Sequence, residues 1–155
     1  MAQKNIYIVS PYFIPDSSLL VALKTAAMRG VKVTVLMAGV HDNPIPYWAA
    51  FSYFEELLKS GVRIFQYQKG FMHAKILSCD GRMCSMGTAN FDIRSLKLNY
   101  EVNAVFYDEK LTLETDQQIA KDLEGSTEIT SEDFNQISLL VRLRNSLMRL
   151  SSALL

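Results

Sequence analysis

The sequence predicts an α/β domain in which a mixed, mostly parallel sheet is flanked by helices and followed by a C-terminal amphipathic helix. Three observations predict this fold class. Three β-rich apolar runs in the first half are joined by segments with helical periodicity, and such strand–helix–strand units pair in parallel through a right-handed crossover. An Asp-Gly pair between two later apolar runs predicts an antiparallel hairpin. The last stretch of the chain has no strand pattern.

Capping and stop residues set the bounds of the expected elements. Asp16 is suited to the N-cap of the first helix and Gly30 to its end. Asp108 is suited to the cap of a later helix. In chain order we expect a strand over 5–10, a helix over 17–29, a strand over 31–36, a helix over 47–60, a strand over 62–67, hairpin strands over 73–79 and 82–87, a strand over 99–107 and a helix from 108 to about 123.

The sequence predicts a boundary near Gly125, which divides a lobe of residues 1–125 from a helical tail of residues 126–155. Thr130 and Asp133 resemble a capping box that opens the tail. Residues 138–155 contain three arginines and no acidic residue. A basic amphipathic helix of this kind can lie on an anionic membrane. The alternative, which we favour because helical apolar faces usually pack against protein, is docking on the domain core or a partner chain. The apolar face comprises Leu139, Leu140, Leu143, Leu147, Leu150 and Leu154.

Length, charge and cysteine content limit the functional classes. The 155 residues suit one domain, and the formal net charge is zero, which argues against a nucleic-acid binder with its usual basic excess. Cys79 and Cys84 are interpreted as reduced thiols, because nothing in the sequence indicates an oxidising compartment. Two thiols alone are also too few for a structural zinc site. No secretory signal is visible, and no run approaches the ~20 apolar residues that span a bilayer. Action on lipid would therefore require contact through the surface or a partner.

The segment from 71 to 101 carries residues suited to phosphate chemistry. His73 and Lys75 are two apart in an expected strand, so we expect both on one face. A neighbouring cation disfavours protonation of imidazole, and neutral imidazole is a nucleophile. Thr88 and Asn90 would add hydrogen bonds to a phosphate, with Gly87 allowing close approach. Taken singly, each of these residues has an ordinary surface or turn role.

Taken together, these residues form a longer pattern. His73, Lys75 and Asp80, followed by Gly87-Thr88-x-Asn90, resemble the HxKxxxxD…GSxN signature of the phospholipase D superfamily, with Thr88 where that family usually has Ser. The flanking segments resemble the C-terminal half of bacterial cardiolipin synthases, so the resemblance covers essentially the whole chain. These segments are residues 7–16, 53–58, 67–75, 89–95 and 98–105.

The resemblance implies a phospholipase D-like lobe and a set of residue roles. His73, Lys75 and Asp80 are the catalytic motif, with His73 as nucleophile or general acid/base and Asp80 more suited to holding the hairpin. Lys75, Thr88 and Asn90 would bind phosphate. Glu101 would orient a motif histidine, the alternative being an ordinary charge at the sheet edge.

The implied reaction is phosphatidyl transfer between phosphatidylglycerol molecules through a phosphohistidine intermediate. The resemblance implies no metal and no cofactor. It implies a phospholipid substrate, a peripheral position on the membrane surface of a bacterial cell, and no nucleic-acid partner.

One departure from the family affects the function. Full enzymes carry two such motifs, whereas here His41 is the other histidine and lacks the lysine spacing. We therefore expect a homodimer or a second phospholipase D-like half, and the position of Met1 favours a truncated or split product. The alternatives are an inactive half-enzyme, or another phosphodiesterase of the superfamily such as a nuclease or lipid hydrolase.

Overall fold

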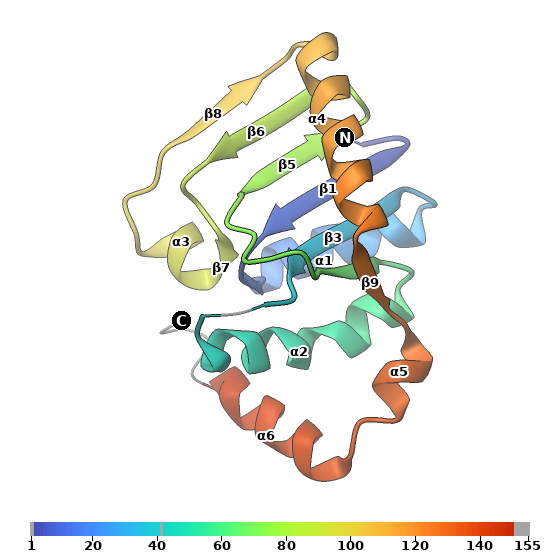
Figure 1. Cartoon of the computed structure of the whole chain (residues 1–155), viewed down its shortest axis with the longest axis vertical. Helices are drawn as coiled ribbons and strands as arrows, with labels where there is room; N and C mark the ends of the chain where they lie inside the picture. Colours follow the sequence, from blue (N-terminus) through green and yellow to red (C-terminus); the bar gives the residue numbers. More distant parts are fainter. Residues whose placement is uncertain (1, 41, 151–155) are drawn as a thin grey trace.

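The computed structural model describes residues 2–40 and 42–150, and for Asn135, Arg149 and Leu150 it describes the backbone alone. His41 and Leu154, both named above, lie outside the described residues. A sheet of seven strands runs through the molecule in the order β8-β6-β5-β1-β3-β4-β9 (Figure 1). Its strands are β1 (Asn5–Ser10), β3 (Lys32–Ala38), β4 (Arg63–Tyr67), β5 (Ile76–Cys79), β6 (Met83–Gly87), β8 (Asn103–Phe106) and β9 (Ser126–Ile129).

The predicted mixed sheet flanked by helices is confirmed, but the expectation that it is mostly parallel is wrong. Among the described strands of this sheet, β1 pairs with β3 and β3 with β4 in parallel. The other four pairings are antiparallel. Helical crossovers, which parallel neighbours require, stop after β4. The hairpin turn at Asp80 and Gly81 then adds β6 antiparallel to β5, and the connection over residues 88–102 returns the chain as β8, antiparallel to β6.

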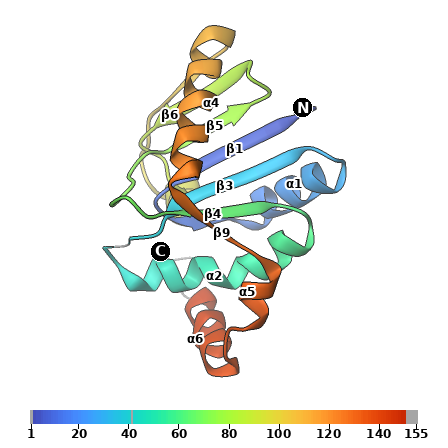
Figure 2. The ribbon, with the colours of Figure 1, turned by 45° about the vertical axis from the view of Figure 1, so that its right-hand side comes forward.

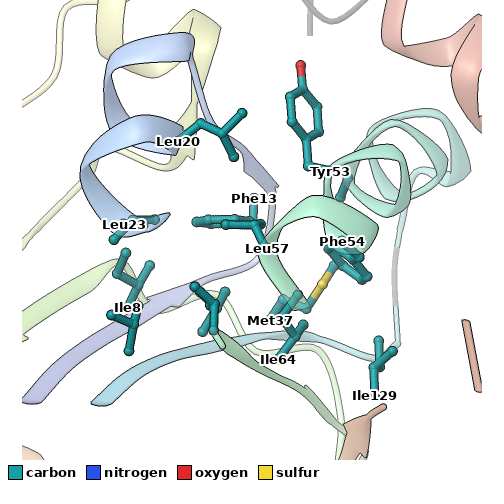
Figure 3. Packing of buried hydrophobic residues seen from close by; sticks show 14 of the residues in the cluster. Ile8, Phe13, Leu20, Leu23, Met37, Tyr53, Phe54, Leu57, Ile64 and Ile129 are labelled. Carbon is teal, nitrogen blue, oxygen red and sulfur yellow. The ribbon is translucent and has the colours of Figure 1, made fainter. Parts of the chain in front are cut away.

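Helices cover both faces of the sheet (Figure 2). α1 (Ser17–Met28) and α2 (Pro44–Lys59) pack on one face and build the larger core, where Leu20 and Leu57 meet Ile8 and Ile64 (Figure 3). α4 (Glu109–Glu124) covers the other face with a smaller core around Ile119. Burying one such large side chain stabilises the fold by about 1.5–3 kcal/mol.

α2 begins at Pro44, three residues before the predicted start. The Asn43 side chain accepts a hydrogen bond from the Ile45 amide at 3.0 Å and so caps the helix. Proline suits the first helical position because its missing N–H would have no partner there. The polar loop that the sequence suggested is therefore shorter, and the N-terminus of α2 lies near the end of β3.

A small second sheet was not predicted. β2 (Phe13–Ile14) pairs in parallel with β7 (Phe91–Asp92), and α3 (Ile93–Lys97) follows directly. The Asp92 side chain accepts a 2.6 Å hydrogen bond from the Ser95 amide and caps α3. This pairing brings the segment after β6 alongside the segment after β1.

The C-terminal region differs in part from the expectation. β9 begins at Ser126 and pairs with β4, so the sheet continues beyond the predicted boundary at 125; the division into two domains stays a prediction. The capping box of Thr130 and Asp133 opens α5 (Ser131–Asn135) as predicted. α6 (Leu139–Leu150) packs on α2. Its leucines at 139, 140, 143 and 147 are exposed, so this part of the apolar face does not pack on the domain core, and its docking on a partner chain stays a prediction. Within residues 2–40 and 42–150, no helix has the length and apolarity to cross a membrane.

A buried polar contact joins α4 to the sheet and makes stability depend on pH. The hydroxyl of Ser78, which is fully buried in β5, donates a hydrogen bond to Asp116 of α4. Burial raises the pKa of Asp116, and the Ser78 hydrogen bond offsets only part of that effect. The folded state therefore binds this proton more tightly than the unfolded chain does.

We predict that wild-type protein gains stability relative to the Asp116→Asn variant as the pH falls from 7 through the raised pKa of Asp116. The gain levels off below the unfolded pKa of about 3.9. Asparagine keeps the acceptor for Ser78 but carries no charge to desolvate. Urea unfolding of both proteins between pH 7 and pH 4 measures the difference. A stability difference that stays constant over this range would contradict the prediction.

Candidate active site

His73 lies in an extended segment, residues 71–75, that leads into β5. Gly70 precedes it with φ +138°, a backbone conformation that other residues rarely adopt, so the turn into this segment favours glycine. The imidazole is exposed, and the ring of Phe71 stacks on it with 5.5 Å between centroids. The ring is therefore accessible to a substrate and is held from one side by an aromatic neighbour.

Lys75 is buried, contrary to the expectation that it shares one exposed face with His73. β5 begins at Ile76, so the strand alternation on which that expectation rested does not reach back to His73. Lys75 is 9% exposed, and its ammonium donates a 2.9 Å hydrogen bond to the backbone carbonyl of His73. Burial lowers the pKa of Lys75, while the carboxylates of Glu101 and Asp92 oppose that shift. The motif lysine thus fixes the backbone that carries the motif histidine.

Thr88 and Glu101 form one hydrogen-bonded unit. The Thr88 hydroxyl donates to Glu101 at 2.5 Å and accepts from the Val102 amide at 2.9 Å. Asn99 donates to the other carboxylate oxygen at 3.2 Å. The hydrogen bond from Thr88, with that from Asn99, holds the pKa of Glu101 below its usual value. Glu101 is therefore a carboxylate already positioned by two donors, and its action on a histidine stays a prediction.

Gly87 serves a different purpose from the one predicted. A Cβ at this position would lie 2.2 Å from the Val102 carbonyl oxygen and 2.6 Å from the Asn103 Cα. The missing side chain therefore allows close approach of β8, rather than of a ligand. It brings Glu101 and Val102 against Thr88.

Asn90 faces a polar cavity of about 230 Å³. Its side-chain oxygen is buried and has no hydrogen-bond partner among the described residues. An orphan acceptor of this kind requires a donor from a substrate, from water or from another protein surface. The backbone of the next residue, Phe91, donates to the buried Ser10 hydroxyl at 3.1 Å, which fixes Asn90 near the end of β1. The cavity lining comprises Tyr12, Ile14, Asn43, Pro46, Asn90, Asp92, Arg94, Ser95 and Asn99.

Sequence reasoning gave no role to two residues beside the motif. The Tyr12 hydroxyl donates to the Asp42 carboxylate. That hydrogen bond holds the pKa of Asp42 below its usual value, and nearby His73 adds to the effect. Burial, followed by the Asp42 contact, raises the pKa of Tyr12 to about 12. The available signal was topological, because loops at the carboxyl ends of parallel strands such as β1 and β3 meet at one edge and commonly form sites.

Asp80 lies at the far end of β5 from the other motif residues. Its carboxylate accepts hydrogen bonds from the backbone amides of Gln3, Lys4 and Asn5 at 2.7, 2.8 and 2.8 Å. Burial alone would raise the pKa of Asp80, but these donors outweigh it and lower the pKa. The contacts favour the structural role for Asp80: it ties the hairpin to the start of β1. In residues 2–40 and 42–150, no three His, Cys, Asp or Glu side chains gather in a metal-binding arrangement.

Comparison with known proteins identifies the family. A family model described as "Cardiolipin synthase, PLD-like domain" matches residues 1–123. The chain belongs to this family. The predicted resemblance to the phospholipase D superfamily and to bacterial cardiolipin synthases is thereby confirmed. The match ends before β9 and contains all the motif residues discussed above, from His73 to Glu101.

Curated cardiolipin synthases resemble the chain along nearly its whole length. The enzyme of Clostridium perfringens strain SM101 is 45% identical over 154 residues, which cover 99% of this chain and 32% of the relative. Cardiolipin synthase 1 of Staphylococcus epidermidis strain ATCC 12228 is 46% identical, with 99% of this chain and 31% of the relative covered. The chain thus spans about a third of the length of these relatives.

Solved structures show the same fold at low sequence identity. The phosphatidylserine synthase of Haemophilus influenzae superposes with a TM-score of 0.78 at 18% identity, over 100% of this chain and 42% of that one. Nuc of Salmonella typhimurium, a phospholipase D family member, superposes with a TM-score of 0.71 at 22% identity, over 84% of each chain. These likenesses confirm the predicted phospholipase D-like lobe.

We predict that Asp80→Ala lowers the free energy of unfolding by about 2 kcal/mol, because three backbone donors lose a charged acceptor. Asp80→Asn should lose less, since asparagine keeps one acceptor oxygen and tolerates the left-handed backbone at φ +56°. The stability that the lowered pKa provides is present above about pH 3.9 and is lost as the pH falls through the folded-state value. Urea unfolding measures all three proteins, and equal stability of Asp80→Ala and wild type would contradict the assignment.

Proposed function

We propose that this chain supplies one half-site of a phospholipase D-type phosphatidyltransferase of the cardiolipin synthase kind. It would transfer a phosphatidyl group between phosphatidylglycerol molecules through a phosphohistidine intermediate. One observation carries the proposal: His73 is exposed, and its backbone carbonyl is held by the buried ammonium of Lys75, in a fold and family shared with cardiolipin synthases. Relatives at about 45% identity over nearly the whole chain support it.

The residues fit the two steps of this transfer. A ring nitrogen of His73 attacks phosphorus, the bond from phosphorus to the glycerol oxygen breaks, and an acid in a second half-site protonates the departing glycerol. The hydroxyl of a second phosphatidylglycerol then attacks the phosphohistidine, gives its proton to that same group and restores His73. Cardiolipin and glycerol are the products.

The remaining site residues would stabilise the phosphate during both steps. Lys75 is partly desolvated, so its charge acts on a phosphate oxygen with less screening than a surface lysine would. Thr88 and Asn90 would add hydrogen bonds to the phosphate. The unpartnered oxygen of Asn90 could accept from the hydroxyl of the attacking or leaving alcohol in the adjoining cavity. Glu101 would orient a motif histidine and stabilise its imidazolium form.

The acid that protonates the departing glycerol would come from a second phospholipase D-like half. This half would be either another copy of this chain or another lobe. An exposed aromatic and aliphatic surface next to Thr88 and Glu101 supports such pairing. We call it the β8 surface, and it comprises Leu98, Tyr100, Val102, Val105, Phe106 and Tyr107. Exposed apolar patches of this kind mark interaction sites. The substrate would place the paired enzyme at the surface of a bacterial membrane.

Replacing His73 tests the nucleophile. We expect His73→Ala to abolish transfer from phosphatidylglycerol vesicles, because the covalent step has no other acceptor for phosphorus. His41→Ala, which removes the histidine outside the motif, should keep transfer. Cardiolipin formation is measured on fractions of known mass, so that an inactive monomer is told apart from an inactive paired form. Substantial transfer by His73→Ala would contradict the assignment of the nucleophile. If wild type transferred the phosphatidyl group to water, a lipid hydrolase would be favoured, and if it cleaved DNA, a nuclease would be favoured.

Replacing Lys75 tests the phosphate cradle. We expect Lys75→Ala to lower the transfer rate by about 10²–10³, the loss that follows removal of one preorganised charge donor. Lys59→Ala removes an exposed lysine paired with Glu55 on α2 and should change the rate less than about twofold. Equal rates for Lys75→Ala and Lys59→Ala would contradict the role of Lys75.

A further inference from the structure

α6 packs on the domain with Asn145 and Met148 on its inward side and four leucines on its outward side. Leu139 and Leu140 are 82% and 79% exposed, and Leu143 and Leu147 are 58% and 52% exposed. Asn145, on the opposite side of the helix, is only 3% exposed. The four leucines therefore face away from the core, whereas the apolar stripe of an ordinary surface helix faces it. We call the four exposed leucines the leucine stripe.

Specific contacts hold the polar side of α6 against the domain. The guanidinium of Arg144 lies 4.2 Å from the ring centroid of Trp48 in α2 and donates to Asn145 at 3.1 Å. Arg142 lies over the ring of Phe134 and donates to its carbonyl oxygen at 2.8 Å. These contacts anchor α6 on α2 and α5, so the helix cannot turn its leucines inward without losing them. Figures 1 and 2 show α6 on the outer side of α2, away from the sheet.

The charge around the leucine stripe points to an anionic partner. Residues 138–155 contain Arg142, Arg144 and Arg149 and no Asp or Glu. At about 100° per residue, Arg142 and Arg144 fall on opposite flanks of the stripe. An apolar stripe bordered by arginines is the pattern of a helix that lies in the interface of an anionic bilayer.

The composition of the stripe distinguishes a lipid from a protein partner. Protein interfaces are enriched in aromatic residues, and the β8 surface has that composition with Tyr100, Phe106 and Tyr107. By contrast, α6, which carries the leucine stripe, contains no aromatic residue over residues 139–150. The leucine stripe and the β8 surface therefore suit different partners.

We propose that the leucine stripe is the surface by which this chain enters the interfacial layer of an anionic phospholipid bilayer. α6 lies parallel to the membrane, with the four leucines among the acyl chains near the headgroups, while Arg142 and Arg144 keep their contacts with Phe134 and Trp48 and add positive charge beside the anionic lipid. This inference rests on the proposed function, since phosphatidylglycerol is both an anionic membrane lipid and the proposed substrate. It adds the element that brings the active site to the bilayer.

The test reads vesicle binding by a signal that does not depend on turnover. The chain has one tryptophan, Trp48, beneath Arg144, so energy transfer from Trp48 to a dansyl-labelled lipid reports the approach of α6 to a bilayer. The full chain is titrated with vesicles of phosphatidylglycerol and phosphatidylcholine, and with vesicles of phosphatidylcholine alone. Wild type should bind the phosphatidylglycerol vesicles at least tenfold more tightly, and added salt should weaken that binding.

The stripe variant combines Leu139→Gln, Leu140→Gln and Leu143→Gln, in which glutamine keeps the helix propensity. We expect at least a tenfold loss of vesicle binding, with unchanged circular dichroism and thermal midpoint because these leucines are exposed. A matched control, Val21→Gln with Met28→Gln at two exposed apolar positions of α1, should bind vesicles as wild type does.

The proposal would be overturned if wild type did not bind vesicles, or if wild type and the stripe variant bound equally well. It would also be overturned if the stripe variant lost binding and its sedimentation mass fell. That result would assign the stripe to a protein partner. Transfer in phosphatidylglycerol–detergent micelles is recorded in parallel. If wild type and the stripe variant are equally active there, the proposed function stands whether or not the stripe binds bilayers.

Discussion

The hydrogen bond from the buried Lys75 ammonium to the His73 carbonyl is the interaction on which the site depends. A lysine is seldom buried, because removing its charge from water costs free energy unless other groups compensate. Here the compensation comes from the His73 carbonyl and from the carboxylates of Glu101 and Asp92. In the proposed reaction the same ammonium would have two roles: it would fix the backbone of the nucleophile, His73, and it would act on the phosphate of the substrate.

The fold places the supporting residues around this pair through two separate pairings. The parallel sheet brings the loops after β1 and β3 to one edge, which delivers Tyr12 and Asp42 to the side of His73. The small β2–β7 sheet brings Asn90 to the same edge. The close contact of Gly87 with β8 then holds Glu101 against Thr88. No single segment of the chain contains the site.

The sequence predicted the fold class, the motif and the family, because each depends on local signals such as periodicity, capping residues and fixed spacing. It did not predict that antiparallel strand pairs outnumber parallel ones, since the direction in which β9 returns to β4 depends on the packing of α4. It placed Lys75 on an exposed strand face because the spacing of two residues implies a strand, but the strand begins only at Ile76. Asp42 and Tyr12 carry no motif, and only their meeting in space identifies them. The outward leucines of α6 could not be predicted either, because contacts with Trp48 and Phe134 decide which side of the helix faces inward.

The central claim is that a histidine presented by a buried lysine forms a covalent bond to phosphorus. The most direct measurement is mass spectrometry of the chain after rapid quenching of its reaction with phosphatidylglycerol under conditions that preserve phosphohistidine. The account predicts a phosphatidyl adduct on the peptide that contains His73, with a smaller yield when Lys75 is replaced by alanine. An adduct on a different residue, or transfer to cardiolipin with no adduct on His73, would contradict it.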